Sequence, residues 1–236
     1  MRQLEYKIIR KGIYYTLSFI LLLWVVKSLE WSQGFDLGTY GIFPRTLKGS
    51  LGIITAPLIH GDIFHLFSNT IPLIVLGIGL FYFYHKIALE VVFWIYFASG
   101  FWVWIIGRDA YHIGASGIVY GILAFLFFGG LLRKNPRSLA ISMIVFFMYG
   151  SMIYGLFPGD ENVSWESHLM GTMAGAFCAI YFRKYPIHTG KGHKMLVWEN
   201  EDIHTGEEGA VNHTADSQTE FIYKVKSKDN SIEDSK

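Results

Sequence analysis

Six apolar stretches dominate the first 185 residues, and they constrain the fold more than any other feature of the sequence. Each has close to the roughly 20 residues that an α-helix needs to cross a bilayer core about 30 Å thick. Most contain Gly, Ser or Tyr, and small residues let membrane helices pack closely. The sequence therefore predicts an all-α membrane protein with a bundle of six transmembrane helices. The stretches cover residues 13–30, 66–85, 88–107, 116–132, 138–157 and 167–183.

The charged residues are distributed unevenly along the chain. They make up 17% of the sequence, against about 25% in an average soluble domain, and more than half of the 19 acidic residues lie after Tyr185. We therefore expect residues 1–185 to form a membrane domain and residues 186–236 to form a polar, mostly disordered tail. The net charge of +1, without a dense basic cluster, argues against a nucleic-acid partner. Cys178 is the single cysteine, which excludes an intramolecular disulfide.

The distribution of Lys and Arg predicts the orientation. The first apolar stretch follows several basic residues, as in a signal peptide, but no small-residue cleavage site follows it, so we interpret it as a retained helix. Basic residues favour the N-terminal side and the segments after the second, fourth and sixth stretches. The loop before the sixth stretch contains acidic residues and neither Lys nor Arg. The positive-inside rule then predicts that both termini are cytoplasmic.

Ser116 opens the fourth predicted helix within the sequence Gly-Ala-Ser-Gly of residues 114–117. The first N–H groups of a helix have no intrahelical partners and lie at the positive end of its dipole, so they can bind an oxyanion. Gly114 permits a tight turn, and Tyr120 lies one helical turn below Ser116 on the same face. The bland alternative is that Gly117 and Gly121, at a small-xxx-small spacing, serve only to pack helices.

His168 opens the sixth predicted helix and shares one face with Gly171 and Gly175, which have the same small-xxx-small spacing. Helices four and six both enter from the outer side, so Ser116 and His168 are expected at equal depth. A histidine at membrane depth is costly and is a candidate for function. Desolvation favours the neutral imidazole, which a general base requires. Alternatively, His168 is a helix-end residue at the headgroup level.

A third motif contains His60, His65 and Asn69. His65 and Asn69 are i, i+4 neighbours, and the Asn69 amide can donate to a developing oxyanion. Alternatively, Asn69 makes an interhelical hydrogen bond without a catalytic role. No carboxylate lies in an obvious orienting position beside His168, because Glu166 is two residues away and does not face it. These residues therefore predict a Ser–His dyad, with stacking on Tyr120 as one way to hold the imidazole.

Together the three motifs resemble the rhomboid family of intramembrane proteases, over roughly residues 10–185. The family pattern is His-x4-His-x3-Asn, then Gly-x-Ser-Gly, then His-x2-Gly-x3-Gly, and all three occur here in order. The resemblance implies that Ser116 attacks the scissile carbonyl and that His168 accepts its proton. It also implies that the Ser116 N–H, His65 and Asn69 hold the oxyanion and that Tyr120 packs on the imidazole.

The resemblance further implies a minimal six-helix rhomboid in the bacterial inner membrane, without cofactor or metal. Its expected partners are the lipid bilayer and single-pass transmembrane substrates, cleaved near the outer membrane–water boundary. The fifth helix, around Phe146, Phe147 and Met148, and the loop 158–165 are expected to act as gate and cap. Some relatives carry Trp-Arg in the first long loop, where this chain has Leu51-Gly52, which leaves the anchoring of that loop open.

Other functions fit the sequence less well. An inactive rhomboid-like binding factor typically lacks the serine or the histidine, and both are present. A zinc peptidase is disfavoured because His60 and His65 are five residues apart, about 140° on a helix, with no Glu between them. An aspartyl protease needs helix-borne Asp residues, which the six stretches lack. A transporter would have to use Glu90, Arg108 and Asp109, which lie at helix ends.

Overall fold

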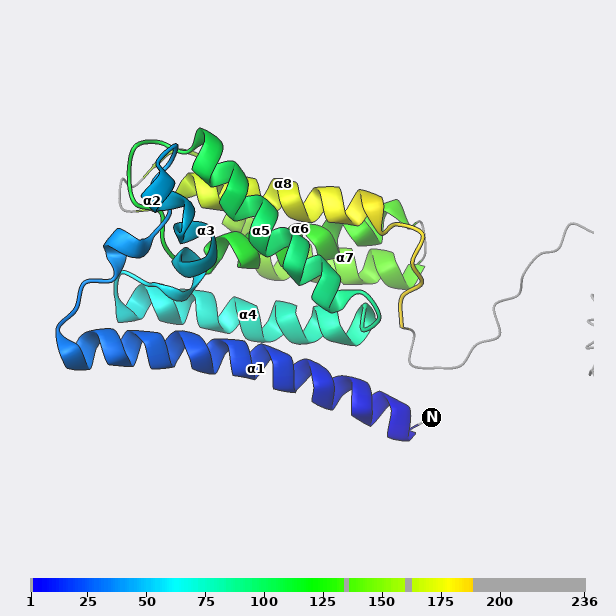
Figure 1. The fold of residues 1–236 in the computed structure, drawn as a ribbon. Coiled ribbons are helices and arrows are strands. Elements are labelled where there is room, and N and C mark those ends of the chain that lie inside the picture. The colour runs from blue at the N-terminus through cyan, green and yellow to red at the C-terminus, as the bar shows by residue number, and fades with distance from the viewer. Residues whose placement is uncertain (1, 134–135, 160–162, 189–236) are drawn as a thin grey trace, which may run out of the picture. The chain divides into compact units, whose positions relative to one another are not determined.

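The computed structural model describes residues 2–133, 136–159 and 163–188, and these are helical apart from loops and turns (Figure 1). Extended pairing in these ranges is limited to an isolated antiparallel bridge between Ile42 and His112. The tail was predicted to be disordered, but its residues after His188 lie outside the described part of the chain. The long helices are α1 (Arg2–Gln33), α4 (Ile63–Phe83), α5 (Ala88–Ile106), α6 (Ser116–Leu132), α7 (Pro136–Tyr149) and α8 (Trp165–Tyr181).

The all-helical architecture predicted from the sequence is confirmed. Within the described residues, four helical segments are long and apolar enough to cross a membrane, whereas α6 and α8 have 17 residues each. The number of six membrane spans therefore stays a prediction. The four segments are Gln3–Gln33, Ile63–Phe83, Ala88–Ile106 and Pro136–Leu156.

Helix α6 lies at the centre of the packing. Most of its residues are buried, as expected for a helix that is apolar on all sides. Helices α4, α5, α7 and α8 all contact it, and α1 lies along α4 at the edge (Figure 1). The nucleophile predicted from the sequence is therefore the first residue of the most enclosed helix.

Four glycines form the contact between α6 and α8, which we call the glycine seam. A Cβ on Gly171 would overlap the carbonyl oxygen of Gly117, and a Cβ on Gly175 would overlap that of Gly121. The two backbones therefore touch, as small residues permit in membrane helices. This contact fixes the register of the two helices and brings the start of α8 beside the start of α6.

The helix boundaries differ most from the sequence prediction in α1 and α7. Helix α1 begins at Arg2 rather than at residue 13, because its polar N-terminal part continues the helix beyond the apolar stretch. Helix α7 ends at Tyr149, and the chain continues as the 3₁₀ helix η3 (Gly150–Leu156), where one helix to residue 157 was expected. Two glycines, Gly150 and Gly155, lie in this segment, and glycine disfavours the α-helix.

The first long loop folds into short helices that the sequence did not predict. They are η1 (Gly38–Tyr40), α2 (Leu47–Ser50), α3 (Gly52–Thr55) and η2 (Ala56–Leu58).

Arg45 anchors this loop to the end of α5. Its backbone N–H donates to the Trp104 carbonyl (2.8 Å) and its guanidinium donates to the Gly107 carbonyl (2.8 Å), beside an ion pair with Asp109. The Trp104 indole donates in return to the Thr46 carbonyl (2.9 Å). The anchoring left open by Leu51-Gly52 is thus supplied by a residue earlier in the loop.

Candidate active site

Ser116 is the first residue of α6 and is 7% exposed. The turn before it depends on Gly114, whose φ of +106° is unfavourable for residues with a side chain. A Cβ at Gly114 would also lie 2.7 Å from Nε2 of His65. The Ala115 N–H donates to Nε2 of His60 (3.3 Å), which holds the same turn from the other side. The Ser116 hydroxyl is therefore set beside the unpaired N–H groups at the start of a helix.

The imidazole of His168 is held in one orientation on α8. Its ring stacks on Tyr120, with centroids 4.2 Å apart and planes 8° from parallel. Its Nδ1 lies 2.9 Å from the Gly155 carbonyl oxygen. A carbonyl only accepts, so Nδ1 carries the proton and Nε2 has the lone pair. This tautomer can take a proton at Nε2, as a general base does.

Helix η3 holds both rings of this stack. The Tyr120 hydroxyl donates to the Met152 carbonyl (2.9 Å), and the carbonyl of Gly155 accepts from His168. A Cβ on Gly155 would overlap the Tyr120 hydroxyl and lie 3.1 Å from Nδ1 of His168. This role of η3 was not predicted from the sequence, since the partners are backbone carbonyls. The glycine itself was the available signal.

The neighbours of Ser116 and His168 are in contact across the glycine seam. A Cβ on Gly117 would lie 3.2 Å from the carbonyl oxygen of Ser167. In the described part of the chain, no hydrogen bond joins the Ser116 hydroxyl directly to His168. Catalytic hydrogen bonds are often long before substrate binds and tighten in the complex.

Asn69 and His65 lie on the first turns of α4. Asn69 is buried, and its side-chain amide donates to the His65 carbonyl one turn earlier (3.0 Å). This bond uses one of the two amide hydrogens and leaves the second for another acceptor. The carboxylate of Asp62 caps α4 by accepting from the His65 backbone N–H (2.8 Å).

His60 and His65 are closer than the sequence analysis expected. Their ring centroids are 5.1 Å apart, although a helical spacing of five would turn them apart. That geometric argument was wrong because His60 precedes α4, which begins at Ile63. Burial and the neighbouring His65 lower the pKa of His60 to about 4, so its ring is neutral near pH 7. Neutral His60 can accept the hydrogen bond from Ala115.

Among the described residues, no group of three His, Cys, Asp or Glu side chains is arranged to hold a metal ion.

The family of this chain follows from its match to a model described as Rhomboid domain, over residues 48–185. The chain belongs to the rhomboid family. The matched residues include every side chain of the candidate site. Family membership and the apolar helices make this rhomboid an integral membrane protein.

Several mycobacterial proteins resemble this rhomboid. Uncharacterized proteins of Mycobacterium tuberculosis and Mycobacterium bovis are each 37% identical to it over 177 residues, which is 69% of this chain and 72% of the relative. An uncharacterized protein of Mycobacterium leprae is 35% identical over 176 residues, or 69% of this chain and 68% of the relative. These relatives show kinship and carry no assigned activity.

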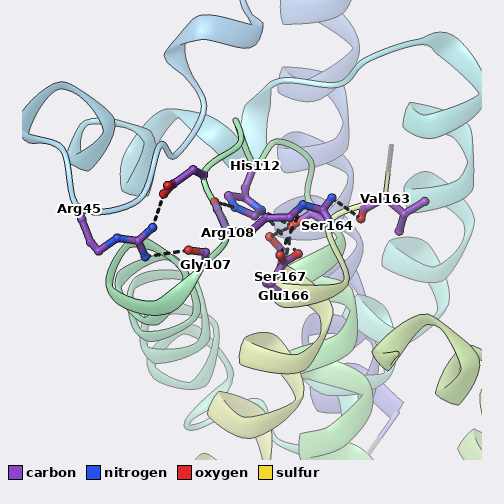
Figure 2. A network of polar contacts seen from close by, with 9 residues as sticks. Arg45, Gly107, Arg108, His112, Val163, Ser164, Glu166 and Ser167 are labelled. Carbon is purple, nitrogen blue, oxygen red and sulfur yellow. Dashed lines mark hydrogen bonds and ion pairs between the residues drawn. The ribbon is translucent and has the colours of Figure 1, made fainter. Parts of the chain in front are cut away.

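A buried carboxylate that was set aside in reading the sequence lies at the end of the site where α8 begins. Glu166 is 4% exposed, and its Oε1 lies 3.5 Å from Nε of Arg108 (Figure 2). Its Oε2 lies 3.9 Å from Nδ1 of His112, which is also buried. The available signal was a helix start: Ser164 is the N-cap of α8 and Glu166 lies in the first turn, where acidic residues are favoured.

Proposed function

We propose that this rhomboid is an intramembrane serine endopeptidase in which Ser116 is the nucleophile and His168 the general base. The observation that carries the proposal is the hydrogen bond from Nδ1 of His168 to the Gly155 carbonyl (2.9 Å), beside the stack on Tyr120. It leaves the basic Nε2 on a helix whose first turn contacts the first turn of α6.

The proposed reaction has two halves. The Ser116 oxygen attacks the scissile carbonyl carbon while Nε2 of His168 takes the hydroxyl proton, which then passes to the leaving amine. Water, activated by the same nitrogen, hydrolyses the acyl-enzyme. The Gly155 carbonyl takes the orienting part that a carboxylate has in a catalytic triad.

The oxyanion of each tetrahedral intermediate needs hydrogen-bond donors. The Ser116 backbone N–H lies at the start of α6, and the second amide hydrogen of Asn69 is available for a ligand. His65 packs against Gly114 in the turn before Ser116 and is the third candidate. Removing one such donor typically lowers the rate about a hundred- to a thousandfold.

The proposed substrates are single-pass transmembrane proteins, cut near the outer membrane–water boundary. Ser116 and His168 both lie at the first turns of their helices, so the reacting groups are close to one membrane surface. Phe146, Phe147 and Met148 are exposed on α7, next to η3. Their exposure supports the proposal that α7 is the gate and that a substrate helix enters beside it. The loop 158–165 is the proposed cap, and residues 160–162 of it lie outside the described part of the chain. We also propose residence in a bacterial inner membrane with both termini cytoplasmic.

Wild-type protein and the variants Ser116→Ala and His168→Ala in liposomes test the proposal. We expect a fluorophosphonate probe to label the wild type, and the wild type to cleave a model single-pass substrate. Both variants should fold, as judged by thermal unfolding, and lose cleavage. Cleavage by either folded variant would exclude the dyad. A folded wild type that neither labels nor cleaves would point instead to a rhomboid-like binding factor.

A further inference from the structure

A partly buried chain of hydrogen bonds ties the start of α8 to the loop before α6 (Figure 2). His112 lies at its centre. Nε2 of His112 is 3.1 Å from the Arg108 carbonyl, which only accepts, so Nε2 carries the proton of the neutral ring. Nδ1 is then an acceptor, and the Ser164 hydroxyl at 2.7 Å must donate to it.

The direction of the remaining bonds follows from this assignment. Having donated to His112, the Ser164 oxygen accepts from the Ser167 hydroxyl (2.7 Å) and from the Ser167 backbone N–H (3.3 Å). The chain therefore runs from the residue before His168 to the loop that leads into Ser116. The backbone of His112 also exchanges two hydrogen bonds with Ile42 (2.9 and 3.0 Å), which ties the first long loop to the same point.

Glu166 adds a charged link across the same junction. Both of its carboxylate oxygens are buried and have no hydrogen-bond partner among the described residues, and they lie 3.5 Å from Arg108 and 3.9 Å from His112. Arg108 also donates to the Val163 carbonyl (3.1 Å), immediately before α8. A buried carboxylate is costly unless opposite charge compensates it, so Glu166 holds the cationic Arg108 in this place.

Resting on the proposed function, we propose that Glu166 is a positioning residue that acts through Arg108, whose backbone carbonyl accepts from Nε2 of His112. It holds the first turn of α8, and with it the imidazole of His168, against the loop that leads into Ser116. The glycine seam fixes the two helices from Gly117 and Gly171 inward. The network of Glu166 fixes the end beyond the seam, where the reacting groups lie. Burial lowers the pKa of His112, while the charge of Glu166 opposes this shift.

The test is the separation of kcat from KM for a single-pass substrate in liposomes, with the full-length protein. Glu166→Gln keeps the shape of the side chain and removes its charge. We expect a kcat about ten- to a hundredfold lower, because small displacements of reacting groups have effects of this size, with KM within about twofold of wild type. Glu166→Asp, which keeps the charge, should fall between Glu166→Gln and wild type.

Glu30→Gln is the matched control. Glu30 is also buried, at 8% exposure, accepts from the Leu37 N–H (3.0 Å) and is paired with Lys27 (2.8 Å). Lys27 in turn donates to the carbonyls of His60 (2.9 Å) and Gly61 (3.0 Å), and a glutamine at position 30 leaves these two bonds in place. We expect this control to lower the unfolding temperature and to leave kcat unchanged. If Glu166→Gln does not fold, Ser164→Ala is the second variant. It removes the hydrogen bond from Ser164 to Nδ1 of His112 and leaves Glu166 paired with Arg108, and the same fall in kcat is expected.

The outcomes separate the two proposals. An inactive wild type would overturn the proposed function, and the positioning role with it. An active wild type with an unchanged kcat in Glu166→Gln would overturn the positioning role alone. The same conclusion follows if kcat falls only in proportion to the folded fraction of the variant, or if Glu30→Gln lowers kcat equally.

Discussion

The imidazole of His168 lies 8° from parallel to the phenol ring of Tyr120, with the ring centroids 4.2 Å apart. Both rings are hydrogen-bonded at their edges to carbonyls of η3, at Met152 and Gly155. The imidazole is therefore held at its face by the Tyr120 ring and at its edge by the Gly155 carbonyl, without a carboxylate. This arrangement supplies the orientation that the proposed dyad requires.

The Tyr120 ring and its hydroxyl make separable contributions. Tyr120→Phe keeps the stack and loses the hydrogen bond to Met152, so we expect a stability loss of about 1 kcal/mol and a modest fall in kcat. Tyr120→Ala removes the face on which His168 rests and should lower kcat much further. Substrate cleavage and thermal unfolding of both variants measure this. Equal kcat values for the two variants would argue against the stack.

Gly155 should tolerate no side chain. Gly155→Ala places a methyl group against the Tyr120 hydroxyl and 3.1 Å from Nδ1 of His168, so η3 must move and the hydrogen bond to the base lengthens. We expect kcat to fall by about tenfold or more. Gly150→Ala is the control in the same segment, because its nearest neighbour would be Phe146 at 3.7 Å. A similar loss in the control would show a general sensitivity of η3.

The glycine seam should be sensitive to single methyl groups. Gly171→Ala or Gly175→Ala would force α8 away from α6, and overpacking of this kind costs about 1–3 kcal/mol. Unfolding in detergent measures the loss, and cleavage should fall with it. Gly79→Ala on α4 meets its nearest neighbour only at 4.0 Å and should be neutral or stabilising. Unchanged stability in both seam variants would contradict the close contact.

Folding stability should decrease in acid through His60. Its pKa is about 4 in the folded chain against the ordinary 6.5, so the unfolded chain binds more protons between these values. Stability is therefore full above about pH 6.5 and falls as the pH drops toward 4. Unfolding midpoints across this range measure the slope, which should be shallower in His60→Gln. Equal slopes in the two proteins would place the titration elsewhere.

The sequence predicted those features that depend on local periodicity. Apolar stretches of about 20 residues indicated the helices, and the spacing of Gly171 and Gly175 indicated a close-packed face. The order of the three motifs indicated the family, which the match over residues 48–185 confirms.

The features that the sequence could not predict depend on backbone atoms or on distant pairs. Stacking of His168 on Tyr120 was predicted from the sequence, but the carbonyls of Met152 and Gly155 have no side-chain signature, so their part in holding the two rings was not predicted. Glu166 and His112 lie 3.9 Å apart although they are far apart in the sequence, so no local pattern predicts their contact. The angle between His60 and His65 was misjudged because the start of α4 at Ile63 was not known.

Because η3 holds both rings, substrate entry past α7 and the orientation of His168 depend on the same segment. This segment continues directly from α7, the helix on the proposed path of the substrate. A displacement of α7 large enough to carry η3 with it would break the bonds of Met152 and Gly155 together. His168 would then be free to rotate or to exchange its tautomer. In the proposed mechanism, His168 would be a poor base until η3 returned, and substrate admission and proton transfer would then be successive events.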